Sequence, residues 1–221
     1  GVNYLLNEQP DKAIEIFTHM LEVNTETVET HLALGSLFRR RGEVERAIRI
    51  HQNLIARPTL DNSQRSEALS ELAQDYLKAG LLDRAETLFL ELAEIPVHAE
   101  QALRFLMSIY EQEKDWDKAI AVGRRLTQLA GRELGPVLAQ YFCELSEVAL
   151  SAGNIKAAHE RATQAVDLDG RCARANVLLG RIAVTNGDER GAIATWQKIE
   201  QQDAALLDEV IHDIVAAFRR M

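Results

Sequence analysis

The chain has 221 residues, of which 47% are hydrophobic and 27% charged, so it holds enough apolar material to bury a core. With only 12 glycines and 4 prolines, it lacks the frequent turn signals of a β-sandwich, which recur about every 8–12 residues. The formal net charge of -9 disfavours nucleic acid and anionic lipid surfaces as general partners and leaves proteins as the favoured class.

A pattern of small and bulky residues recurs along the chain. It consists of an apolar-x2-Leu-small-x2-aromatic segment, a turn glycine, and then Ala-x3-bulky. The intervals between the alanines are 34, 38, 34, 39 and 34 residues, and the alanines are Ala13, Ala47, Ala85, Ala119, Ala158 and Ala192. Each copy predicts two antiparallel helices, because a glycine in the left-handed conformation ends the first helix.

In chain order, the copies predict six helix-turn-helix repeats and a final helix. The repeats are expected at residues 1–26, 27–60, 65–98, 99–134, 138–171 and 172–205, and the final helix at 206–221. Gly35 and Gly180 occupy the position of the pattern that requires a small residue, where two helices are expected to approach closely. Lys114 stands where the other copies have the turn glycine. Since one hairpin cannot bury its own apolar face, the repeats must stack.

This period and these anchors resemble the tetratricopeptide repeat. The resemblance implies an all-α, right-handed superhelical solenoid that forms a single domain over residues 1–221. The first helices of such a stack form a concave wall that can bind an extended peptide or a partner's helix. Helical spacing predicts that this wall includes Arg39, Arg40, Gln74, Lys78, Arg104, Ser108, Glu147, Arg174 and Arg181.

No catalytic motif is found in the sequence. It contains no GxxxxGK[ST], GxGxxG, GxSxG or HExxH, and no two of its six histidines lie three or four residues apart. The chain is therefore expected to be no enzyme, with no catalytic residue, metal ligand or cofactor of its own. Asp115 and Asp117 flank a turn and are expected to cap a helix.

The cysteines and two histidines are interpreted as structural. Cys143 and Cys172 are 29 residues apart without a CxxC, which is neither a disulfide framework nor a zinc pattern and fits a reducing compartment. Cys143 is expected to pack as a small hydrophobe. His31 and His51 occupy positions usually filled by packing residues, and we expect them to be partly buried.

Beyond the repeat pattern, the amino-acid sequence resembles one family in particular. Similarity to the repeat domain of the bacterial lipopolysaccharide assembly protein B family begins with GVNYLLNEQPDKAIEIFTHMLEVNTETVETHLALGSLFRRRGEVERAIRIHQNLIARP and continues to the end. Members of that family have a short N-terminal membrane helix, tetratricopeptide repeats and a C-terminal rubredoxin-like module with two CxxC pairs that would hold iron or zinc. Only the middle part is expected in this chain, with both ends cut.

The resemblance implies a non-enzymatic adaptor at the cytoplasmic face of the bacterial inner membrane, attached only through the missing N-terminal helix. Its implied partners are the membrane protease FtsH, the lipid A deacetylase LpxC, whose degradation it would promote, and membrane lipopolysaccharide factors. Two alternatives stay open: a scaffold that assembles lipopolysaccharide transport components, and the substrate-presenting arm of a truncated enzyme. Self-association into a homo-oligomer is also open.

Overall fold

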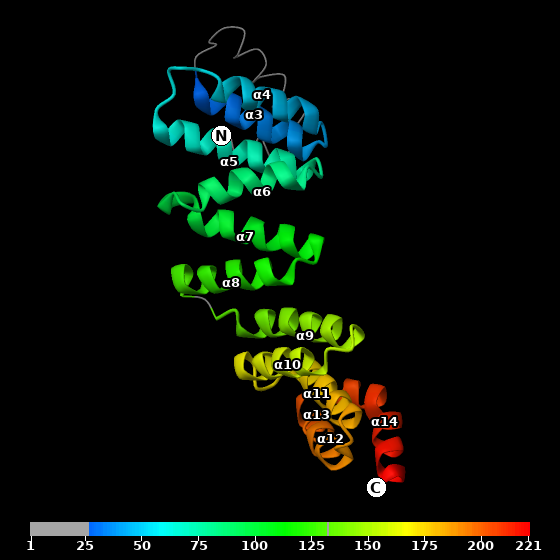
Figure 1. Ribbon diagram of the computed structural model, residues 1–221. Coiled ribbons are helices and arrows are strands. Elements are labelled where there is room, and N and C mark those ends of the chain that lie inside the picture. The colour runs from blue at the N-terminus through cyan, green and yellow to red at the C-terminus, as the bar shows by residue number, and fades with distance from the viewer. Residues whose placement is uncertain (1–26, 132) are drawn as a thin grey trace. The chain divides into compact units, whose positions relative to one another are not determined.

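The computed structural model describes residues 27–131 and 133–221. Every regular element within these ranges is a helix, and successive helices are joined by short turns (Figure 1). The predicted all-α class is confirmed. The first expected repeat, residues 1–26, with its anchor Ala13, lies outside the described residues.

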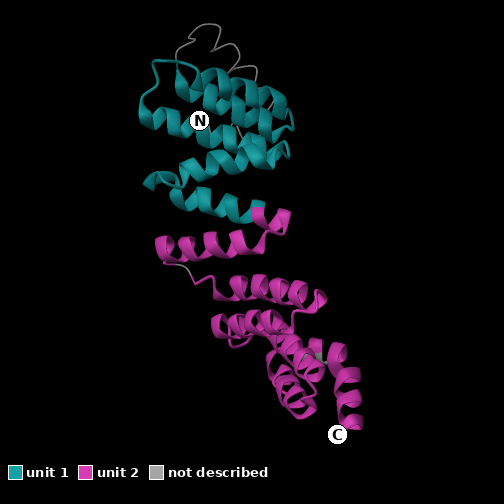
Figure 2. Ribbon diagram, in the orientation of Figure 1, with its two compact units in different colours: residues 1–109 teal, residues 110–221 magenta. Residues whose placement is uncertain are grey.

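The chain divides into two compact units, residues 1–109 and 110–221 (Figure 2). The single uninterrupted solenoid expected from the sequence stays a prediction. The helices described for the first unit are α3 (Val28–Arg40), α4 (Val44–Ile55), α5 (Asn62–Lys78), α6 (Leu82–Leu92) and α7 (Pro96–Glu113), whose last turn belongs to the second unit.

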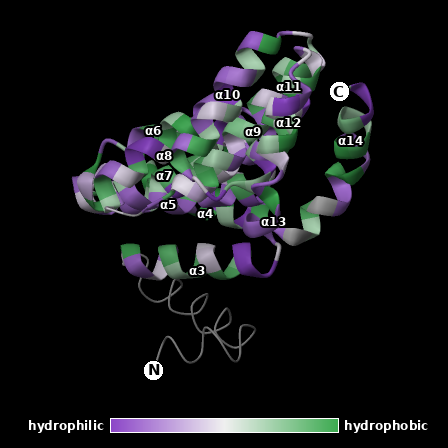
Figure 3. Cartoon of the chain, turned by 90° about the horizontal axis from the view of Figure 1, so that it is seen from below, coloured by the Kyte–Doolittle hydropathy of each residue, from purple (hydrophilic) through white to green (hydrophobic). Residues whose placement is uncertain are grey.

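Within the first unit, neighbouring helices pack through apolar side chains. Helix α3 contacts both α4 and α5, and α5 also contacts α4 and α6. One cluster joins Leu37 and Phe38 of α3 to Ala47 of α4. Apolar and polar residues are mixed along α3 (Figure 3), and its buried residues are Thr30, Leu32, Leu34, Gly35, Leu37 and Phe38.

The second unit contains the remaining helices. They are α8 (Trp116–Ala130), α9 (Gly135–Ser151), α10 (Ile155–Leu168), α11 (Ala173–Thr185), α12 (Glu189–Trp196), α13 (Ile199–Gln202), the 3-10 turn η1 (Ala204–Leu206) and α14 (Leu207–Arg220). Helix α11 contacts α9, α10 and α12, and α14 contacts α12. A core around Trp196, Ile199 and Val210 joins these last elements.

The anchors of the sequence pattern lie at the closest contacts within a hairpin. Ala47, Ala85, Ala119, Ala158 and Ala192 have no exposed surface. A Cβ atom built on Gly35 would lie 2.3 Å from Nε2 of His51, and one built on Gly180 would lie 2.1 Å from Nε1 of Trp196. A side chain from the second helix therefore lies directly on the glycine of the first.

The turns between paired helices use the left-handed backbone region. The turn glycines have φ angles between 74° and 82° and are Gly42, Gly80, Gly153 and Gly187. Lys114 adopts the same region with φ 56°, the only described residue other than glycine with a positive φ. Lys114 thus replaces the turn glycine of the other copies, but the backbone conformation of the turn is the same.

Three first helices begin three residues before the expected repeat starts at 65, 99 and 138. Helix α5 begins at Asn62 because Asp61 forms a capping box: its Oδ1 accepts from the Gln64 N–H at 2.8 Å, and Gln64 Oε1 accepts from the Asp61 N–H at 3.2 Å. Helix α7 begins at Pro96 itself, and α9 has Pro136 in its first turn.

Among the described residues, no helix combines the length and the apolar character needed to span a bilayer.

Candidate partner-binding pocket

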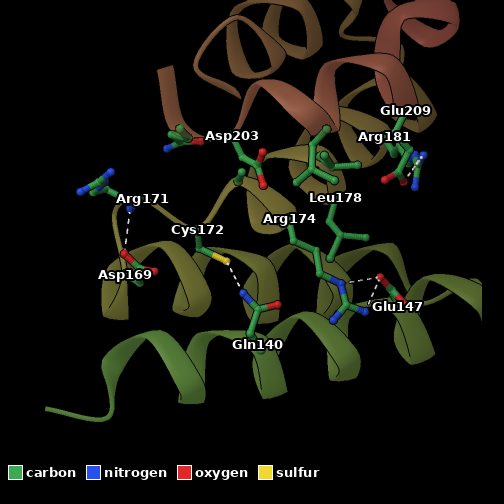
Figure 4. A pocket seen from close by; sticks show the side chains of 14 residues that line it. Gln140, Glu147, Asp169, Arg171, Cys172, Arg174, Leu178, Arg181, Asp203 and Glu209 are labelled. Atoms are coloured by element: carbon green, nitrogen blue, oxygen red, sulfur yellow. Dashed lines mark hydrogen bonds and ion pairs between the residues drawn. The ribbon is translucent and has the colours of Figure 1, made fainter. Parts of the chain in front are cut away.

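A pocket of about 420 Å³ lies in the second unit (Figure 4). Helix α9 contributes Gln140 and Glu147, and α11 contributes Arg174 and Arg181 among others. The loop before α11 and the segment from α13 into α14 complete the lining with Asp169, Arg171, Cys172, Gln202, Asp203, Leu206 and Glu209. First helices of two consecutive predicted repeats therefore meet in this pocket.

Arg174 connects the two first helices. Its Nη1 lies 2.8 Å from Glu144 Oε1, and its Nη2 lies 2.8 Å from Glu147 Oε1, both on α9. Burial opposes the charge of the guanidinium, but hydrogen bonds to Glu147 and Glu144 outweigh burial and raise the pKa of Arg174. The ion pairs fix the spacing of α9 and α11 at this wall.

Arg181 makes the corresponding connection between α11 and α14. Its Nη2 lies 3.0 Å from Glu209 Oε1, and its Nε lies 3.4 Å from Asp213 Oδ2. Both pocket arginines that the sequence predicts are thus already paired with carboxylates, as Figure 4 shows for the Arg174 pair with Glu147.

The other side of the pocket is tied by amide hydrogen bonds. Gln202 Nε2 donates to the Gly170 carbonyl at 2.9 Å, and Asn176 Nδ2 donates to Gln202 Oε1 at 2.9 Å. Val177 and Leu178, which are almost fully buried, form an apolar floor. Arg171 lies at the exposed edge, and its backbone N–H donates to Asp169 Oδ1 at 3.0 Å.

The pocket thus combines an apolar floor with charged and amide groups that are paired with one another within the protein. Within the part of the chain that the structure describes, no group of three or more His, Cys, Asp or Glu side chains is arranged to hold a metal ion.

Three of the nine residues predicted for the binding wall, Glu147, Arg174 and Arg181, line this pocket together. In the first unit, Arg39 of α3 instead bridges to α5. Its Nη2 lies 2.7 Å from Glu71 Oε2 and its Nη1 lies 2.7 Å from Asp75 Oδ1, while Gln74 Oε1 lies 3.4 Å from Nη2.

The remaining four predicted wall residues lie apart from the pocket. Arg104 pairs with Glu100 one turn earlier on α7, at 2.7 Å, and Ser108 is half-buried on the same helix. Arg40 and Lys78 are exposed at the last turns of α3 and α5. Their role in binding stays a prediction.

Sequence reasoning missed a buried polar network in the first unit. His51 Nδ1 lies 2.6 Å from Asp75 Oδ2, and neither side chain has exposed surface. The prediction that His51 is partly buried is therefore an underestimate. Two polar residues at core positions of neighbouring copies were the available signal, since each needs a buried partner.

The sequence also hid a cysteine pair. Cys143 in α9 and Cys172, the N-cap of α11, have their sulfur atoms 3.8 Å apart, and both residues are buried. Their spacing matches no cysteine motif because the contact depends on the stacking of two repeats. Only the repeat alignment, which places Cys143 in the first helix of one copy and Cys172 at the start of the next copy, pointed toward it.

Comparisons with known proteins identify the fold family. Sequence profiles of the tetratricopeptide repeat match residues 30–66, 70–133 and 143–205. The chain belongs to the tetratricopeptide-repeat family. The solved structure of the C-terminal part of a tetratricopeptide-repeat protein from Cytophaga hutchinsonii has the same fold, with a TM-score of 0.58 and 12% sequence identity. The match covers 98% of this chain and 83% of that chain.

This tetratricopeptide-repeat chain also has relatives that match along nearly all of its 221 residues. It is 37% identical over 221 residues to lipopolysaccharide assembly protein B of Escherichia coli K12, covering 100% of this chain and 57% of that protein. The Haemophilus influenzae protein of the same name is 36% identical over 222 residues, and the match covers 96% of this chain and 55% of that protein. The resemblance inferred from the sequence is confirmed, and the chain spans little more than half the length of these relatives.

Proposed function

We propose that this chain is a non-enzymatic, protein-binding adaptor in lipopolysaccharide assembly. The observation that carries the proposal is the 37% identity to lipopolysaccharide assembly protein B along all 221 residues. The tetratricopeptide-repeat fold supports it, because stacked helical hairpins present walls for binding proteins. The proposal includes no cofactor held by these residues.

The binding site in this proposal is the pocket between α9, α11 and α14. Its apolar floor at Val177 and Leu178 would take an apolar side chain of a partner segment. Its rim carries both guanidinium and carboxylate groups, so the partner segment would carry both charges as well.

The more specific form of the proposal concerns proteolysis. In it, the adaptor works at the cytoplasmic face of the bacterial inner membrane and couples the protease FtsH to degradation of the deacetylase LpxC. The membrane attachment would come from polypeptide other than these 221 residues. Sequence resemblance to the lipopolysaccharide assembly protein B family supports this form.

A photo-crosslinking experiment in cells tests the pocket. A photoreactive amino acid replaces Arg171, which is exposed at the pocket edge. The matched control replaces Lys156 on α10, whose side chain is 90% exposed and does not line the pocket. We expect FtsH, LpxC or a membrane lipopolysaccharide factor to be captured from position 171 and not from 156. Capture of none of these proteins, or equal capture from both positions, would contradict the proposal.

The LpxC half-life separates the specific proposal from the transport scaffold. In cells lacking the gene, coupling to FtsH predicts a longer LpxC half-life, measured after translation is stopped. An unchanged half-life together with defective lipopolysaccharide transport would overturn the coupling and favour the scaffold.

A further inference from the structure

The two cysteines of the chain stand in contact within the second unit. The Sγ atoms of Cys143 and Cys172 are 3.8 Å apart, and the structure holds both as free thiols. A disulfide needs a separation of about 2.05 Å, so oxidation must bring the two sulfur atoms closer together than they are in the reduced protein. Since the chain has two cysteines in total, this contact is the one place where an intramolecular disulfide can form.

The environments of the two thiols differ. Cys172 is the N-cap of α11, where the partial positive charge of a 13-residue helix favours a thiolate. Gln140 Nε2 also lies 3.5 Å from its sulfur, in position to donate a hydrogen bond (Figure 4). Cys143 lies inside α9 with no exposed surface, where burial favours the neutral thiol.

The direction of the pKa shifts agrees with this geometry. The hydrogen bond with the Cys143 thiol outweighs burial and lowers the pKa of Cys172, with smaller contributions from the Ala175 backbone N–H and the charge of Arg174. The same hydrogen bond, with burial, raises the pKa of Cys143. One sulfur is thus suited to attack an oxidant and the other to act second.

A small oxidant can reach Cys172 through the pocket. Cys172 is one of the residues that line the space of about 420 Å³, which is much larger than a peroxide molecule. Hydrogen peroxide is small and uncharged, so the acidic and basic side chains that line the pocket do not exclude it.

We propose that Cys143 and Cys172 form a peroxide-sensitive modification site, which closes into a reversible disulfide joining α9 to the start of α11. The inference is independent of the proposed function because it requires no protein partner.

The reaction balances with hydrogen peroxide as the oxidant. The Cys172 thiolate attacks one peroxide oxygen, the O–O bond breaks, and the departing hydroxide takes up a proton to become water. The Cys172 sulfenic acid is then attacked by the Cys143 sulfur. An S–S bond forms, the S–O bond breaks, and the hydroxyl leaves as water with the Cys143 proton. Two thiols are oxidised and one peroxide is reduced to two waters, and a dithiol reagent reverses the change.

The disulfide has a structural consequence. It would link the first helices of two consecutive repeats across 29 residues of sequence, so the unfolded state would lose freedom. The disulfide would also involve the sulfur atom that Gln140 Nε2 contacts at the pocket wall.

Peptide mass spectrometry tests the proposal on the purified 221-residue protein. After treatment with hydrogen peroxide and alkylation of remaining thiols, we expect a non-reduced digest to contain one peptide pair that links Cys143 and Cys172. The pair should be lost on reduction with dithiothreitol, and the oxidised protein should unfold at a higher temperature than the reduced one. Both thiols remaining alkylatable, or disulfides only between molecules, would overturn the proposal.

Single-cysteine variants test the assigned order. In Cys143→Ser, Cys172 should stop at the sulfenic acid, which dimedone traps. In Cys172→Ser, Cys143 should react with peroxide about tenfold more slowly than Cys172 does in the first variant. Equal rates would overturn the assignment of Cys172 as the attacking thiol. Because serine at position 143 places a hydroxyl in a fully buried site, Cys143→Ala serves as a second variant. Its sulfenic acid should also be trapped by dimedone, but more slowly than in Cys143→Ser, because alanine cannot donate the hydrogen bond to Cys172.

Discussion

Side chains from two helices meet at Asp75 of α5, a carboxylate without exposed surface. Oδ1 accepts from Arg39 of α3 at 2.7 Å, and Oδ2 lies 2.6 Å from Nδ1 of His51 in α4. A buried carboxylate is stable only when its oxygens are satisfied in this way. This residue therefore holds α3 and α4 on α5.

Replacing Asp75 should weaken the first unit strongly. In Asp75→Asn, the amide cannot balance the charge of Arg39 and cannot accept at both positions. We expect the free energy of unfolding to fall by about 2–4 kcal/mol, measured by urea denaturation. The control is Glu71→Gln, since Glu71 also binds Arg39 but is 23% exposed, and it should cost clearly less. If the free energy of unfolding fell equally in the two variants, burial of the carboxylate would not determine how much stability is lost.

Gly35 provides the second residue-scale prediction. Because a Cβ at this position would lie 2.3 Å from the His51 ring, Gly35→Ala should destabilise the protein by about 1–3 kcal/mol, despite the better helix propensity of alanine. The ring cannot easily move, since Asp75 holds it. In the background of His51→Ala, the same substitution should become neutral or stabilising in urea denaturation. A loss of the same size in both backgrounds would contradict the contact.

His31 makes stability depend on pH. Burial, helped by the positive charge of Arg57, lowers the pKa of His31 although the Thr27 carbonyl favours its charged form. Arg57 Nη2 donates to His31 Nε2 at 2.7 Å, so this nitrogen must be unprotonated. The unfolded state therefore binds more protons below about pH 6.5, and stability falls as the pH falls through this window.

We expect His31→Gln to lose less stability than the parent protein between about pH 7.5 and 5.5, as measured by urea midpoints at each pH. Parallel curves for the two proteins would exclude His31 as the source.

At the scale of elements, a helical hairpin depends on its turn. Gly42, Gly80, Gly153 and Gly187 supply positive φ angles at no steric cost, whereas Lys114 pays that cost between α7 and α8. The Asp115 N–H donates to the Tyr110 carbonyl at 2.9 Å across this turn, as the Leu81 N–H donates to the Tyr76 carbonyl across the turn at Gly80. The hairpin geometry is the same and only the residue differs.

Lys114→Gly should therefore stabilise the protein by about 1 kcal/mol in urea denaturation, because it removes the strain of a left-handed lysine. Gly80→Ala is the matched opposite change and should destabilise by a similar amount. A Lys114→Gly variant that is less stable than the parent would contradict the assignment of strain to this turn.

The sequence predicted the helices well because the signals that define them are local. The anchor alanines, the turn positions and the Asp115 cap follow from residues within one copy, and Asp115 Oδ1 does accept from the Lys118 N–H at 3.2 Å. The starts of α5, α7 and α9 were misplaced because caps and prolines, not the repeat register, determine them.

The site was less predictable. Helical spacing can place Arg39 and Arg174 on first helices, but it cannot tell that their partners, such as Asp75 and Glu147, lie in another copy. Which arginine faces solvent depends on contacts between repeats, and the same is true of the two cysteines.

At the scale of the whole molecule, the two compact units predict local unfolding. Repeat proteins transmit stability between neighbouring hairpins, so damage should fade with distance along the chain. In Asp75→Asn, hydrogen exchange measured by mass spectrometry should become faster in residues 28–92 and stay unchanged in 135–196. Faster exchange of equal size in both ranges would mean that the chain unfolds as one cooperative body.

The pocket arginines are already paired with carboxylates, and this limits the affinity of any acidic ligand that binds there. A partner carboxylate that approaches Arg174 competes with Glu144 and Glu147, and one that approaches Arg181 competes with Glu209 and Asp213. The net gain is then the difference between an old ion pair and a new one, which is small in water. Such an exchange of ion pairs favours brief occupancy of the pocket and fast release over permanent capture.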